Sequence, residues 1–194
     1  MNNKNIGILE YYFTQAGERS SDKVQEVLKK AEEYLYREGI REIASDEENN
    51  VLKFKVSAEK YENLPAEYEL DVSLGERKIY LKQKLFQENK KSAIHSMRWY
   101  INRRNRNMPK GMKYYLSPVR LECSISMNGD WENELLRHIL DMMCITGDDY
   151  KSLEYLKEGI VPDKIQCMIR QEYERYEGEI ANGISIREND SGFE

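Results

Sequence analysis

The side chains best suited to nucleophilic or metal chemistry are three cysteines, Cys123, Cys144 and Cys167, and two histidines, His95 and His138. Three thiolates and one imidazole form a ligand set that zinc accepts. Structural zinc sites usually take ligands in pairs about two to four residues apart, whereas these cysteines are 21 and 23 residues apart. Their odd number and spacing fit neither a metal site nor a disulfide framework. We therefore expect reduced, mostly buried thiols and no metal.

Two pairs of adjacent acids, Glu47-Glu48 and Asp148-Asp149, offer oxygen ligands or acid–base groups. Each pair lies at an expected turn or helix start, where such side chains are favoured for local hydrogen bonding. The chain also lacks a phosphate-binding glycine loop, a dinucleotide fingerprint and the HExxH, GxSxG and CxxC motifs. We expect no catalytic residue and no cofactor, and a protein that is not an enzyme. An enzyme of unknown class remains an alternative.

The charged residues are distributed unevenly along the chain. Residues 77–113, here called the basic segment, carry twelve Lys or Arg against the single acid Glu88. Since the whole chain has a formal charge of −5, the other 157 residues carry −16. Such a separation is typical of a protein that joins oppositely charged surfaces, in itself or in a partner.

Length and composition indicate a folded domain with polar ends. The 194 residues are 40% hydrophobic and 34% charged, against about 45–50% and about 25% in average globular proteins. No apolar run approaches the roughly 20 residues that cross a bilayer, and Glu10 interrupts the apolar residues near the N-terminus. We expect a cytoplasmic protein with a modest core that does not bind membranes.

Hydrophobic periodicity predicts two helices and several strands before residue 106. Asp22 and Gln25 have the spacing of a capping box, so the first helix is expected to start at Asp22 and to end at Gly39. Short alternating runs bounded by turn residues predict antiparallel strands near 40–45, 51–56, 68–72 and 79–85. A second helix is expected over 88–105. Its apolar stripe includes Met97 and Ile101.

A strand pair, a helix and a C-terminal helix are expected after residue 111. The strands cover 112–116 and 119–127, with Ser117-Pro118 at their turn. A helix follows Asp130 and stops at Thr146-Gly147, and a shorter one starts at Asp148. The C-terminal helix has apolar residues at helical spacing, namely Ile165, Met168, Ile169, Tyr173 and Tyr176. The domain organisation is thus an N-terminal extension at 1–21, an α+β domain at 22–160, a C-terminal helix at 161–178 and a flexible tail at 179–194.

The middle of the chain resembles the YbjN-like family, whose fold is similar to that of class I type III secretion chaperones. The local cues are a helix ending in Trp99-Tyr100-Ile101-Asn102, a loop to Gly111, a strand at Met112-Lys113-Tyr114-Tyr115 and a second strand from Val119. The resemblance covers about residues 22–156. It implies an α+β, chaperone-like fold with an antiparallel sheet of five to six strands. It also implies a non-catalytic module that works by contact, often as a homodimer, with no catalytic residues to carry over.

We therefore expect a protein-interaction module of the chaperone or adaptor type that presents a basic helix face and a sheet surface. The predicted partner-binding residues are Lys91, His95, Arg98, Arg103, Arg104 and Arg106. Their partner would be an acidic helix, the acidic tail of the chain or a second subunit. The alternative is nucleic-acid binding, in which aromatic residues of the basic segment such as Tyr80 and Trp99 stack on bases. The overall negative charge opposes that alternative.

Overall fold

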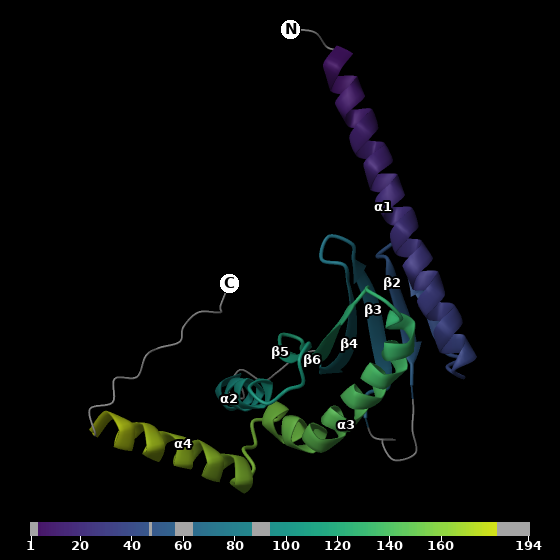
Figure 1. Cartoon of the computed structure of the whole chain (residues 1–194). Coiled ribbons are helices and arrows are strands. Elements are labelled where there is room, and N and C mark those ends of the chain that lie inside the picture. The colour runs from purple at the N-terminus through teal and green to yellow at the C-terminus, as the bar shows by residue number, and fades with distance from the viewer. Residues whose placement is uncertain (1–3, 47, 57–63, 87–93, 182–194) are drawn as a thin grey trace.

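The computed structural model describes residues 4–46, 48–56, 64–86 and 94–181, and the side chains of residues 21–178 within these ranges. Its helices are α1 (Lys4–Arg37), α2 (Ile94–Asn105), α3 (Trp131–Lys157) and α4 (Asp163–Ala181). Its strands are β1 (Ile43–Asp46), β2 (Val51–Lys55), β3 (Glu67–Ser73), β4 (Lys78–Phe86), β5 (Met112–Leu116) and β6 (Val119–Ser126). Figure 1 shows how these elements are arranged.

The six strands form one antiparallel sheet in the order β1-β2-β3-β4-β6-β5. The sequence prediction of an α+β fold with helix-strands-helix-strands-helix order and a further C-terminal helix is confirmed. Ser117-Pro118 forms the turn between β5 and β6, as expected, since Leu116 pairs with Val119. The predicted C-terminal helix is also present, although Tyr173, one of its apolar residues at helical spacing, is 66% exposed. Helix α4 continues through residues 179–181, which the sequence prediction placed in the tail, and the rest of the predicted tail, residues 182–194, lies outside the described residues.

One face of the sheet forms the core with the helices. Alternation in β6 buries Leu121, Cys123 and Ile125, and Cys123 lies between Leu81 of β4 and Met112 of β5. Helix α1 contacts β2 and β3, and α3 contacts β6, so both pack on this face. Fully burying one such aliphatic side chain contributes about 1.5–3 kcal/mol. The alternating pattern therefore determines which side of each strand the helices cover.

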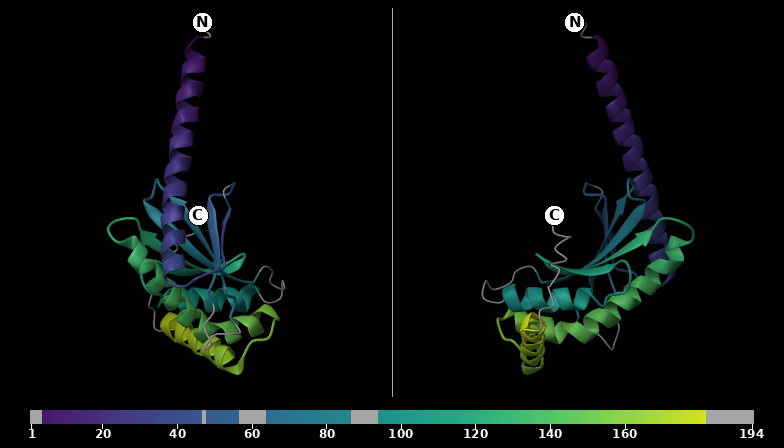
Figure 2. Two further views of the ribbon diagram at one scale, coloured as in Figure 1. Left: turned by 90° about the vertical axis from the view of Figure 1, so that its right-hand side faces the viewer. Right: turned by 60° about the vertical axis from the view of Figure 1, so that its left-hand side comes forward.

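The opposite face of the sheet carries charged residues in a cross-strand row. Register places Lys53, Glu69, Lys82, Glu122 and Lys113 side by side on β2, β3, β4, β6 and β5. Opposite charges directly across antiparallel strands stabilise a sheet by about 0.2–1 kcal/mol per pair. No helix of the described chain covers this face (Figure 2). Lys82 of β4 and Lys113 of β5 are thus matched by acids of neighbouring strands.

Helix α1 begins at Lys4, so the prediction that the first helix starts at Asp22 is wrong. No proline occurs between Lys4 and Asp22, and nothing else there must end a helix. Gln25, expected to complete a capping box, instead donates from Nε2 to Oδ1 of Asn50 at 2.9 Å. The first half of α1 extends beyond the sheet, while its second half packs on the core (Figure 1, Figure 2).

Helix α3 is continuous from Trp131 to Lys157, so the predicted stop at Thr146-Gly147 is also wrong. A glycine inside a helix costs about 1 kcal/mol relative to alanine. Contacts on both sides of Gly147 offset that cost. The buried Thr146 hydroxyl donates to Oε1 of Gln83 at 2.7 Å, and Asp149, two residues after the glycine, is buried. Tertiary packing has therefore overridden a local stop signal.

The three thiols differ in their exposure. Cys123 is buried, and burial raises the pKa of its thiol to about 12. Cys144 and Cys167 are exposed, so the prediction of mostly buried thiols is wrong for these two. Cys144 lies on the solvent side of α3 beside the buried Met143, because successive helix positions face different directions.

A thiol titration checks this arrangement. With an aromatic disulfide reagent at pH 8, two thiols of the native protein are expected to react quickly, and the third only after denaturant is added, because the thiolate is the reactive form. The double variant Cys144→Ser, Cys167→Ser should show no fast thiol. Three fast thiols in the native protein would contradict the burial of Cys123.

Candidate interaction site on helix α2

Most of the predicted binding residues lie on helix α2, and the apolar stripe of the helix determines its orientation. Met97, Tyr100 and Ile101 are buried at helical spacing, as the sequence predicted. His95 and Arg98 face outward and are exposed. In both figures α2 lies between the β5 end of the sheet and α4 (Figure 1, Figure 2). The helix therefore has one side committed to the core and another that can meet a second helix.

The last residue of α2 is tied to an edge strand. Asn105 donates from Nδ2 to the carbonyl oxygen of Tyr114 at 3.0 Å and accepts from the Tyr114 amide with Oδ1 at 2.8 Å. One side-chain amide thus forms both hydrogen bonds that a neighbouring strand would form. Unpaired edge strands invite pairing with other chains. Asn105 occupies this edge of β5 and also fixes the end of α2 relative to the sheet.

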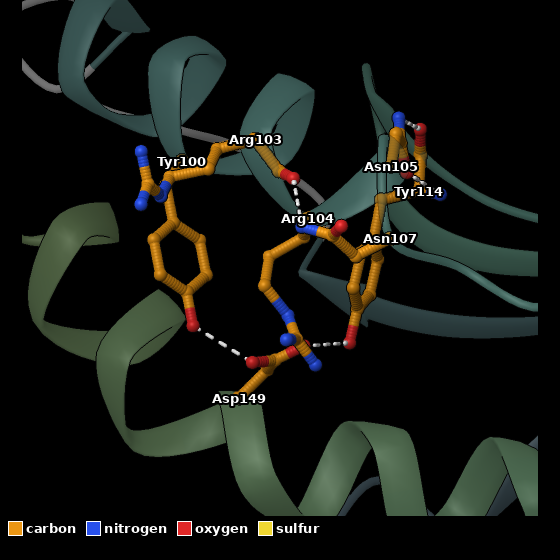
Figure 3. Close-up of polar contacts among 7 residues, drawn as sticks. All are labelled: Tyr100, Arg103, Arg104, Asn105, Asn107, Tyr114 and Asp149. Atoms are coloured by element: carbon orange, nitrogen blue, oxygen red, sulfur yellow. Dashed lines mark hydrogen bonds and ion pairs between the residues drawn. The ribbon is translucent and has the colours of Figure 1, made fainter. Parts of the chain in front are cut away.

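A buried carboxylate, Asp149 of α3, binds the inner side of α2. It is 3% exposed. Its Oδ1 accepts from the Tyr100 hydroxyl at 2.7 Å, and its Oδ2 accepts from Arg104 Nε at 2.8 Å and from the Tyr114 hydroxyl at 3.1 Å (Figure 3). Both carboxylate oxygens are satisfied and the charge is paired. These are the conditions under which a carboxylate is tolerated in a protein interior.

Burial and the neighbouring carboxylate act on the two tyrosines in the same direction. Burial raises the pKa of Tyr100 and of Tyr114 above the ordinary value, and the negative charge of Asp149 raises both further. Both hydroxyls therefore stay protonated and remain hydrogen-bond donors at neutral pH. Two neutral tyrosine hydroxyls and one ion pair, Asp149 with Arg104, therefore connect α2, β5 and α3.

A second acid, Glu172 of α4, binds Arg103 of α2 and Arg106, which directly follows the helix. Its side chain is only 10% exposed. Oε1 accepts from Arg106 Nη1 at 3.2 Å, and Oε2 lies 3.5 Å from Arg103 Nη1. Oε2 is buried and makes no hydrogen bond among the described residues. The guanidinium of Arg103 also lies over the Trp99 ring, 5.5 Å from its centre. Glu172 is therefore paired in charge but incompletely hydrogen-bonded.

The predicted binding residues thus separate into four groups. Arg104 is half-buried, with its guanidinium held by the buried Asp149. Arg103 and Arg106 contact α4 while remaining partly exposed. His95 and Arg98 are exposed and form no ion pair with any described residue. Lys91 lies outside the described residues. We call the outward residues His95, Arg98, Arg103 and Arg106 the α2 basic face.

The two acids that meet α2 were not identified from the sequence, although a signal for each exists. Asp149 continues the spacing of buried α3 residues, which are Met142, Thr146, Asp149, Leu153 and Leu156. Glu172 follows Ile165 and Ile169 at the same helical spacing. A carboxylate inside an apolar stripe predicts a buried partner. In both cases the partner is an arginine of the basic segment.

Other features of the described residues offer little for catalysis. No three His, Cys, Asp or Glu side chains among them could together hold a metal ion. A shallow hollow of about 440 Å³ lies against β1 to β4. Lys55, which lines it, is 3.4 Å from Glu42 and 3.9 Å from Glu67. Lys55 of this hollow therefore already meets opposite charges.

Comparison of the chain with protein-family models, curated proteins and solved structures gives no match. The resemblance to the YbjN-like family and to type III secretion chaperones therefore stays a prediction. Among the described helices, none is both long and apolar enough to cross a membrane.

Removal of the buried carboxylate is expected to destabilise the fold. Asp149→Ala leaves Arg104 and two tyrosine hydroxyls without their acceptor, and we expect a loss of about 3 kcal/mol in the free energy of unfolding. The neighbouring Asp148 is exposed, so Asp148→Ala is the matched control and should change stability by less than about 0.5 kcal/mol. Urea unfolding followed by circular dichroism measures both. Equal effects would contradict the role of Asp149.

The raised tyrosine pKa values also predict a pH dependence. In the unfolded chain tyrosines ionise near pH 10, whereas buried Tyr114 stays protonated, so stability is complete below about pH 10 and falls as the pH rises further. One such group contributes about 1.4 kcal/mol per pH unit. Tyr114→Phe should therefore lose stability less steeply between about pH 10 and 12. The exposed Tyr155→Phe is the control and should follow the wild type; identical slopes for all three proteins would contradict the prediction.

Proposed function

We propose that this protein is a non-catalytic, cytoplasmic protein-interaction module that binds an acidic partner through the α2 basic face. The observation that carries the proposal is the docking of Glu172, because two arginines of that face already hold a helix-borne carboxylate that is 10% exposed. The partner is another protein or a second copy of the chain. Three cysteines with no disulfide among them fit a reducing compartment.

Charge pairing favours an acidic protein over nucleic acid as the partner. Within the described residues, five basic residues of the basic segment form ion pairs with acids elsewhere in the chain, namely Lys78, Lys82, Arg103, Arg104 and Arg106. Nucleic acid presents a continuous row of phosphates and favours an uninterrupted basic surface. Here Glu172 interrupts that surface beside Arg103 and Arg106. A single carboxylate on a partner helix therefore matches the positive charge that remains on the α2 basic face better than a row of phosphates does.

Electrostatics would govern how such a partner arrives and orients. Exposed charges on an interface raise the association rate and fix orientation more than they add affinity. Their contribution weakens as salt rises, with a screening length of about 8 Å at physiological ionic strength. His95 lies four residues before Trp99 and Arg98 directly precedes it; Trp99 is half-buried and adds apolar area beside the charges. The face thus combines steering charges with an aromatic contact.

Quantitative affinity capture from the source lysate tests the proposal. The double variant His95→Glu, Arg98→Glu should capture at least tenfold less partner than the wild type. Capture by the wild type should weaken as the salt concentration increases. Lys151 is an exposed residue of α3, so Lys151→Glu is the matched charge control and should capture as much partner as the wild type does. Unchanged capture by the double variant would contradict the proposal, as would RNA or DNA as the bound species.

A further inference from the structure

We propose that α4 is a displaceable occupant of the α2 basic face, and that the natural partner is an amphipathic helix with the pattern of α4. This inference rests on the proposed function. The partner helix would carry apolar residues at the positions of Ile165 and Ile169 and a carboxylate at the position of Glu172. Helix α4 then competes with the partner within the same chain.

The first support is the narrow attachment of α4. Of its apolar residues Ile165 is buried, whereas Met168 and Ile169 are only half-buried and Tyr173 is 66% exposed. By contrast, α3 buries residues along its whole length from Trp131 to Leu156. Helical stability in proteins comes mainly from packing of an apolar face. Helix α4 has little of it, so it can leave the body of the protein more easily than α3 can.

The second support is the incomplete pairing of Glu172. Its buried Oε2 has no hydrogen bond among the described residues, although Arg103 Nη1 lies 3.5 Å away. Asp149, in comparison, receives three hydrogen bonds at 2.7 to 3.1 Å. A buried acceptor without a donor opposes the contact that buries it. A carboxylate that reaches both arginines with hydrogen-bonding geometry would replace Glu172 favourably.

The third support is the positive charge that α4 leaves exposed. With α4 in place, His95 and Arg98 still form no ion pair with any described residue. Arg98 and Arg106 are eight residues apart on or just after α2, which corresponds to roughly 12 Å along a helix axis. A competing helix with one acid at the Glu172 position and another about 12 Å away would satisfy both. Additional acids therefore distinguish the partner from α4.

A direct test uses the full-length chain and a fluorescent peptide with the sequence of residues 161–178. In the wild type, α4 occupies the face and reduces the apparent affinity for the peptide. Glu172→Arg in the chain should release α4, and its affinity for the peptide in fluorescence anisotropy should be at least tenfold higher than that of the wild type. Glu174→Arg makes the same charge change at an exposed position and is expected to bind like the wild type.

Two further variants keep the test independent of folding. A peptide with the Glu172→Arg change should not bind the Glu172→Arg chain, since arginines would then meet arginines. Adding Arg106→Glu to the Glu172→Arg chain should restore α4 docking and abolish peptide binding. Equal binding of the wild type and the Glu172→Arg chain would overturn the inference. Dimers of the wild type that form with rising concentration through exchange of α4, seen by light scattering and lost in Glu172→Arg, would show that α4 of a second copy is the occupant and would overturn the inference of a partner helix with additional acids.

The result is separable from the test of the proposed function. Peptide binding that depends on Glu172, together with partner capture that is unaffected by His95→Glu, Arg98→Glu, would support displacement of α4 and contradict the proposed binding surface. Capture that depends on these residues without peptide binding would contradict displacement alone.

Discussion

The arrangement of the helices depends on one buried carboxylate. Asp149 lies in the middle of α3 and is 3% exposed, so its charge must be compensated locally. The compensating groups are Tyr100 and Arg104 of α2 and Tyr114 of β5. A carboxylate with these donors requires α2 to lie against both α3 and the edge of the sheet. The same requirement directs the half-buried Arg104 toward α3, while Arg98 and Arg103 of α2 face away from Asp149.

Contacts between distant segments offset part of the charge separation along the sequence. Asp149 and Arg104 are 45 residues apart, and Glu172 and Arg106 are 66 residues apart, yet each pair is in contact. The two contacts differ in kind. In the first, the carboxylate is 3% exposed and both of its oxygens accept hydrogen bonds, whereas in the second one carboxylate oxygen has no donor among the described residues and Arg106 is exposed. One helix thus combines a structural ion pair with a contact suited to exchange.

The sequence predicted those features that depend on local periodicity. Alternation identified the strands, and the stripe of Met97 and Ile101 identified the inner side of α2. Local signals failed at Asp22 and at Gly147, where helix continuity depends on neighbours distant in the chain. The two acids that meet α2 escaped detection because Asp149 resembled a helix start and Glu172 one of many charges. The burial of these two acids depends on the assembled fold, and the hydrophobic pattern of the sequence alone identified no partner for either.

The different character of the two contacts is most directly tested by hydrogen exchange at increasing salt. Exposed charge pairs are screened by salt, whereas buried ones are screened much less. Amides of α4 should therefore exchange faster between low salt and about 1 M, while amides of α3 around Asp149 should keep their protection. Equal protection of α4 and α3, unchanged by salt, would contradict the distinction between a structural and an exchangeable contact on α2.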